Sequence, residues 1–138
     1  MLPGVVSLLL ALEARPSTTV ALLTGNHSHA ARIKLERFGL LSYFRFGAFG
    51  EDAADRNDLV AFALERAWAV GVPMLAPRDV VVVGDTPLDV ACGHANGAVA
   101  VAVATGGCSL PDLEAAGADL AVTDLSDTSK FLDFLHRS

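Results

Sequence analysis

Two carboxylates four residues apart give the chain its clearest chemical signature. Four consecutive valines lead into Gly84 and Asp85, and Asp89 follows. The valines predict a buried strand, so we expect Asp85 at its carboxyl end and Asp89 in the first turn of the next helix, on the same face. Two carboxylates there suit Mg²⁺, which takes few protein ligands and keeps several waters and phosphate oxygens. The same spacing fits a plain alternative, in which Asp85 caps the helix and Asp89 favours its positive end.

Polar residues also follow two other predicted strands. Thr24-Gly25-Asn26 ends the apolar run 19–23, and Thr105-Gly106-Gly107 ends the run 98–104. In parallel sheets, ligands bind beyond the carboxyl ends of the strands. The segment Thr24-Gly25-Asn26 is therefore a candidate phosphate loop, although the same residues also form ordinary turns.

Short apolar runs alternate with helical patterns along the whole sequence, which predicts βαβ units and a mainly parallel sheet flanked by helices. We expect an α/β, Rossmann-like fold in a single domain covering residues 1–138. The expected strands are 19–23, 44–49, 79–83, 98–104 and 119–122. The expected helices are 5–12, about 28–39 with Ser28 as a possible cap, 57–70, a helix ending near 95, 110–116 and 127–136.

Composition excludes several classes of partner. Hydrophobic residues make up 52% of the 138 residues, enough for a sizeable core, and the net charge is −6. An acidic protein has no electrostatic surface for nucleic acid or for an anionic membrane. The apolar run after Pro3 is too short to span a membrane. Cys92 and Cys108 are isolated and predict two small buried thiols, as in a cytoplasmic protein.

The string Val80–Val90, with Gly84-Asp85-Thr86-Pro87-Leu88-Asp89, closely resembles the fourth motif of the haloacid-dehalogenase-like (HAD) hydrolases. The resemblance implies that Asp85 and Asp89 hold the catalytic Mg²⁺. It also implies that Thr24, Gly25 and Asn26, which resemble the second motif, bind the phosphate of a small phosphorylated substrate. Within the superfamily the chain looks most like the group related to phosphoglycolate phosphatase.

The third HAD motif is a Lys or Arg near a helix start that balances the charge of nucleophile and phosphate. No lysine lies between Lys34 and Lys130, so an arginine must serve. Arg56 is the best candidate, because Arg66 is mid-helix and Arg78 precedes a strand. The alternative is a solvated arginine that balances the nearby acids Asp52, Asp55 and Asp58.

The first HAD motif is absent: no Asp in the sequence has another Asp two residues later. In the family the first Asp of Asp-x-Asp is the nucleophile and the second the general acid and base. Its strand lies between the strands that here end at Thr24 and Asp85. We therefore expect a HAD-type core with its first strand missing, inactive as an isolated chain and prone to self-association through exposed sheet edges. The alternative is a non-catalytic module that binds a metal, a phosphate or a partner.

Overall fold

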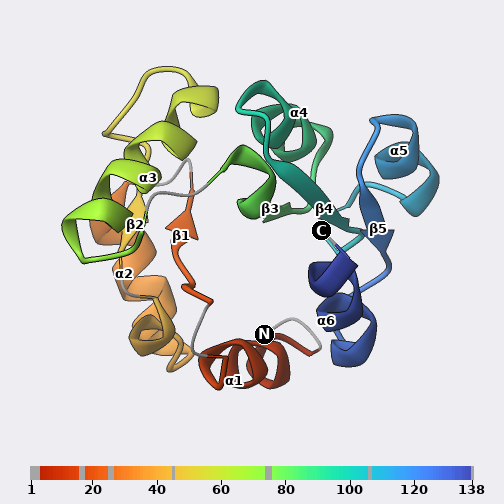
Figure 1. Cartoon of the computed structure of the whole chain (residues 1–138), viewed down its shortest axis with the longest axis horizontal. Coiled ribbons are helices and arrows are strands. Elements are labelled where there is room, and N and C mark those ends of the chain that lie inside the picture. Colours follow the sequence, from red (N-terminus) through yellow and green to blue (C-terminus); the bar gives the residue numbers. More distant parts are fainter. Residues whose placement is uncertain are drawn as a thin grey trace. The chain divides into compact units, whose positions relative to one another are not determined.

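In a computed structural model, the chain divides into two compact units (Figure 1). The N-terminal unit is Leu9–Met74, and the C-terminal unit comprises Met1–Leu8 and Leu75–Ser138. The structure describes residues 4–15, 18–24, 27–44, 46–73, 76–105 and 107–137. Helix α1 (Val5–Glu13) has residues in both units. The two units are described separately.

The N-terminal unit is built on two short parallel strands, β1 (Leu22–Leu23) and β2 (Gly47–Ala48), with Leu22 opposite Gly47. Helix α2 (Ser28–Arg37) and the 3₁₀ turn η1 (Leu41–Tyr43) connect the two strands. Helix α3 (Leu59–Ala69) follows the 3₁₀ turn η2 (Arg56–Asp58) and packs against both strands. The buried side chains of this unit include Ala31, Leu40, Ala48, Leu59, Val60 and Ala67.

The C-terminal unit holds a three-stranded parallel sheet in the order β3-β4-β5. A short 3₁₀ turn, η3 (Pro77–Asp79), precedes the sheet. The strands are β3 (Val81–Gly84), β4 (Val99–Val103) and β5 (Leu120–Val122), and the helices are α4 (Pro87–Ala95), α5 (Leu110–Ala115) and α6 (Thr128–Arg137). Helix α4 packs on β3 and β4, whereas α5 packs on β4 and β5 (Figure 1).

Close packing fixes α4 above the sheet. Val90 of α4 and Leu113 of α5 form a buried cluster with Ala100 and Ala102 of β4. A Cβ added at Gly93 would lie 3.3 Å from the Cβ of Ala100, so the helix approaches the strand through a position that has no side chain. Because α4 is held in this way, its first turn has a fixed place at the end of β3.

The α/β class and the parallel strands are confirmed, and the elements lie close to their predicted positions. The strands are shorter than predicted: the described part of the segment 19–23 pairs only at Leu22–Leu23, and that of 44–49 only at Gly47–Ala48. The described strands also form two separate sheets and not one. None of the helices described has the length and apolar character that a membrane crossing needs.

Candidate active site

The loop between β3 and α4 brings Asp85 and Asp89 together. Asp85 is the first residue after β3, and Asp89 lies in the first turn of α4. One carboxylate oxygen of Asp89, Oδ2, accepts the N–H of Asp85 at 3.0 Å and the N–H of Thr86 at 3.1 Å. The same oxygen accepts the hydroxyl of Thr86 at 3.1 Å. The carboxylate of Asp89 therefore lies against the backbone that carries Asp85.

Gly84 makes this arrangement sterically possible. A Cβ at position 84 would overlap with Cβ, Cγ and Oδ2 of Asp89. No side chain fits there unless the first turn of α4 moves. The glycine of the Gly-Asp pair is thus needed so that the Asp89 carboxylate can fold back onto the end of β3.

The capping role falls to Thr86 and not to Asp85. Thr86 has extended backbone angles at the N-cap, and Asp89 at the third helical position completes a capping box. The alternative in which Asp85 itself caps α4 is therefore wrong, because Asp85 lies one residue too early. Asp85 is half-buried at the carboxyl edge of the sheet.

The predicted phosphate loop is described only in part. Thr24 follows β1, where its N–H donates to the carbonyl of Ala48 at 3.2 Å. Gly25 and Asn26 lie outside the described residues. Helix α2 begins directly after this loop, which agrees with a phosphate loop that leads into a helix N-terminus.

Ser28 does not cap α2 as the sequence suggested. The N-cap is His27, whose ring nitrogen Nδ1 accepts the N–H of His29 at 3.4 Å. Ser28 is the first helical residue, and Glu51 receives both its N–H at 2.7 Å and its hydroxyl at 2.5 Å. The hydroxyl of Ser28 is the main reason why the pKa of Glu51 is lowered. A carboxylate from 23 residues away thus holds the start of α2.

Arg56 is the first residue of η2, the short turn that directly precedes α3. Its backbone position agrees with the predicted place at a helix entry, while its side chain is outside the described part of the structure. Arg56 is not the only arginine that balances the nearby acids, since Asp52 pairs with Arg66.

Arg66, predicted to lie in the middle of a helix, makes the tightest ion pair among the described residues. Its Nη1 and Nη2 lie 2.6 and 2.7 Å from the two carboxylate oxygens of Asp52, and Nη1 also donates to the carbonyl of Gly47 at 2.6 Å. Phe49 donates its N–H to Asp52 at 2.7 Å. The Arg66 guanidinium and then the Phe49 N–H lower the pKa of Asp52 to about 2. This pair anchors the loop after β2 to α3, and helical spacing alone gave no signal for it.

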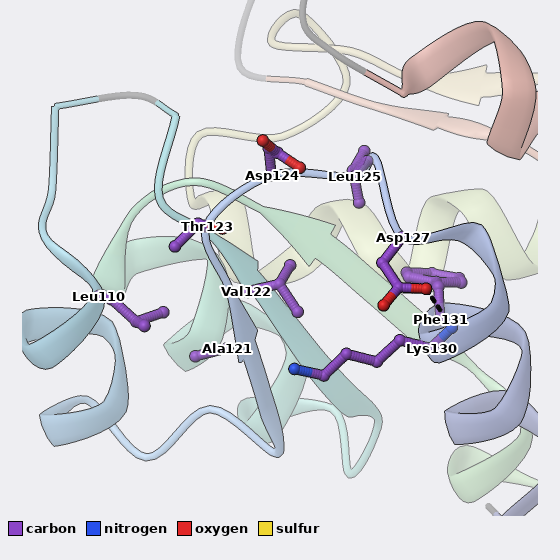
Figure 2. A pocket seen from close by; sticks show the side chains of 9 residues that line it. All are labelled: Leu110, Ala121, Val122, Thr123, Asp124, Leu125, Asp127, Lys130 and Phe131. Atoms are coloured by element: carbon purple, nitrogen blue, oxygen red, sulfur yellow. Dashed lines mark hydrogen bonds between the residues drawn. The ribbon is translucent and has the colours of Figure 1, made fainter.

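A second feature of the C-terminal unit lies at the end of β5 (Figure 2). A pocket of about 230 Å³ is bounded by the residues after β5 and by α6, and the side chain of Lys130 extends along it. The two acids at its rim already bind backbone: Asp124 accepts the N–H of Ser126 at 2.8 Å, and Asp127 that of Lys130 at 3.0 Å. The side chain of Lys130 reaches from α6 toward β5, and this pocket was not predicted from the sequence.

A histidine–carboxylate pair lies at the opposite edge of the same sheet. His94 Nε2 is 2.9 Å from Asp119 Oδ2, which also accepts the N–H of Ala100 at 2.8 Å. Asp119 precedes β5 and Ala100 is near the start of β4. The pair therefore joins α4 to the amino ends of two strands, where it has a structural role away from Asp85.

The structure brings Asp85 and Asp89 together in the C-terminal unit, whereas Thr24 and Arg56 belong to the N-terminal unit. A single site that joins all four residues stays a prediction. No group of three or more His, Cys, Asp or Glu side chains within the described ranges is arranged to hold a metal ion. Of the two cysteines, Cys92 is buried as predicted and Cys108 is only partly buried.

A family model described as HAD-hydrolase-like matches residues 55–128. Solved structures share the fold over almost the whole chain. A hydrolase from Pseudomonas syringae is 27% identical with a TM-score of 0.77, over 96% of this chain and 61% of its own. A predicted phosphatase from Clostridium acetobutylicum is 23% identical with a TM-score of 0.79, over 94% of this chain and 59% of its own.

A predicted phosphoglycolate phosphatase from Haemophilus somnus is 22% identical with a TM-score of 0.78, over 95% of this chain and 56% of its own. The chain thus spans only 56–61% of the length of these three structures. No curated protein sequence matches it.

Proposed function

Because the chain belongs to the HAD-like hydrolase family, we propose that it supplies most of the core of a magnesium-dependent phosphatase acting on a small phosphomonoester. The observation that carries this proposal is the loop Gly84–Asp89. It places a half-buried carboxylate at the carboxyl end of a parallel strand, with a second carboxylate folded against the same backbone. Ligands of α/β proteins bind at this edge.

The residues of the loop fit Mg²⁺. This ion is usually bound by one or two carboxylates and keeps water and substrate oxygens in its other positions. A pair of aspartates without a third protein ligand is therefore a suitable donor set. Asp85 would hold the ion, with Asp89 beside it on the same turn. When bound, the ion would neutralise charge on the phosphate and orient its oxygens.

The phosphate would be held by residues of the N-terminal unit. Thr24 offers a hydroxyl at the end of β1, and the family resemblance assigns Gly25 and Asn26 to the same phosphate site. Helix α2 begins soon after them in the sequence, and N–H groups at a helix start favour an anion. Arg56 at the entry to α3 would balance the negative charge. These roles rest on the family resemblance and on the backbone positions of Thr24 and Arg56.

The sequence contains no Asp-x-Asp, so we propose that this chain alone does not turn over a phosphomonoester by the family's covalent route. Loss of a general acid by itself typically costs about 10²–10⁴-fold in rate. The same absence favours a second candidate function, a non-catalytic module that retains binding of metal or phosphate.

Hydrolysis of p-nitrophenyl phosphate in the presence of Mg²⁺ tests this proposal, with Asp85→Ala as the control. We expect wild type and Asp85→Ala to release the same background amount of p-nitrophenol, while phosphate binding to wild type increases when Mg²⁺ is added. Turnover above the control would contradict the proposed inactivity. A phosphate affinity that is the same with and without Mg²⁺ would contradict a site in which the metal assists phosphate binding.

A further inference from the structure

The N-terminal unit contains a second pocket, lined in part by the first half of α2. Its volume is about 380 Å³, within the range of about 300–1,000 Å³ that is usual for small-molecule sites. One wall is the first half of α2, with Ser28 and Arg32. The lining also includes Phe44, Phe46 and Phe49, which come before and after strand β2 in the sequence. The pocket is therefore lined both by aromatic rings and by polar side chains of α2.

The helix wall follows from the spacing of α2. Ser28, Arg32 and Leu35 lie four and then three residues apart, so their side chains share one helical face, and all three line the pocket. Arg32 is exposed to solvent at the pocket. Its guanidinium is a permanent positive charge whose planar N–H groups match the oxygens of a carboxylate or phosphate.

The carboxylates of the described residues leave this arginine without a counter-charge. Glu51 pairs with His27 at 3.3 Å and also binds Ser28, and Asp52 pairs with Arg66. Glu36, one helical turn after Arg32, makes no ion pair with it. Among the described residues, the guanidinium of Arg32 therefore makes no ion pair and can take an anionic ligand, while the Glu51 carboxylate is held at Ser28.

We propose that this pocket binds a small molecule with a flat apolar body and one anionic group. The phenylalanines would contact the flat body, since aromatic rings stack or pack edge to face with other rings, and Arg32 would pair with the anion. The lining residues of this pocket all belong to the N-terminal unit, whereas the Asp85 loop belongs to the C-terminal unit. The chemical class is an aryl carboxylate, sulfonate or phosphate.

A titration of the full ¹⁵N-labelled chain with 2-naphthoate, followed by amide chemical shifts, tests the proposal. We expect saturable shifts confined to the first half of α2 and to the residues around β2. Arg32→Gln should weaken binding by about fivefold, the size expected for an ion pair at an exposed position. Arg37→Gln is the matched control, because Arg37 ends the same helix and does not line the pocket.

Two further measurements separate the contribution of the Arg32 charge from that of the apolar contacts, and this pocket from the metal site. The neutral analogue 2-naphthylmethanol should bind weakly and equally to wild type and to Arg32→Gln. Asp85→Asn should leave naphthoate binding unchanged, so that failure of the metal site and failure of this pocket are distinguishable. No saturable shift in wild type, shifts in the C-terminal unit alone, or equal naphthoate affinity in Arg32→Gln and wild type would each overturn the proposal.

Discussion

Helices α2 and α4 both begin after a parallel strand, and a carboxylate holds the first turn of each. At α4 the carboxylate is Asp89, three residues after the cap Thr86, and it binds the loop that joins strand to helix. At α2 the carboxylate is Glu51, which reaches Ser28 from 23 residues away. The first arrangement is local and partly shielded, whereas the second depends on tertiary structure and faces solvent.

The difference shows that the loops after the two strands are held in place in different ways. The loop at α4 is held largely by neighbouring residues, because Asp89 accepts hydrogen bonds from Asp85 and Thr86 and Gly84 leaves room for its side chain. At the start of α2, Glu51 places a carboxylate beside the helix N-terminus that is proposed to lie near the phosphate. We therefore expect changes in the α4 loop to affect stability more than changes at Glu51.

Gly84→Ala should have the largest effect. The new Cβ would overlap the Asp89 side chain and displace the first turn of α4, for a loss of about 3 kcal/mol in the free energy of unfolding. Gly107→Ala is the control: φ there is +99°, but a Cβ meets nothing within 4 Å, so the loss should be about 1 kcal/mol. Urea unfolding measures both, and an equal or smaller loss for Gly84→Ala would show that the overlap is relieved without cost.

Arg66→Ala should follow, with a loss of about 2 kcal/mol at pH 7, because Asp52 and the carbonyl of Gly47 each lose a partner. This expected loss allows for solvent screening of the ion pair, since 37% of the Arg66 side chain is exposed. Arg66→Lys should be intermediate, as it keeps the charge and loses the two-pronged contact.

The pH dependence of the stability lost in Arg66→Ala shows whether the ion pair with Asp52 is responsible for it. The pKa of Asp52 falls from 3.8 to about 2 in the folded chain, so its stabilising contribution is complete well above pH 3.8 and is lost as pH falls toward 2. The difference between wild type and Arg66→Ala should shrink over that interval. A difference independent of pH would mean that packing of Arg66, and not its pairing with Asp52, is responsible.

The carboxylates at the two helix starts, Asp89 and Glu51, should give the smallest effects, and they compare the two helices directly. Asp89→Ala should cost about 1 kcal/mol, because the capping box at α4 loses one of its two side chains. Glu51→Gln should cost less, because Glu51 is exposed. The pKa of Glu51 is below 4.5 in the folded chain, so its contribution is present above pH 4.5 and fades below it. A larger loss for Glu51→Gln than for Asp89→Ala would reverse the comparison.

The sequence predicted features that depend on neighbouring residues. The strand before Gly84, the following helix and the shared turn of Asp85 and Asp89 are confirmed, because valine runs, glycine and a capping box act over a few residues. The contacts of Glu51 with Ser28 and of Arg66 with Asp52 were not predicted, since they join residues 23 and 14 apart. The pocket beside Lys130 was missed because residues of β5 and of α6 come together there only in the folded chain.

Binding of Mg²⁺ measured by isothermal titration calorimetry tests the central claim most directly. Wild type should bind one Mg²⁺, and Asp85→Asn should lose at least about tenfold in affinity, because a principal carboxylate ligand is replaced. Asp133→Asn, at an exposed position in α6, removes the same charge away from the loop and should bind as wild type does. Equal affinities of wild type and Asp85→Asn, or no binding by wild type, would contradict the assignment of the Gly84–Asp89 loop as a metal site.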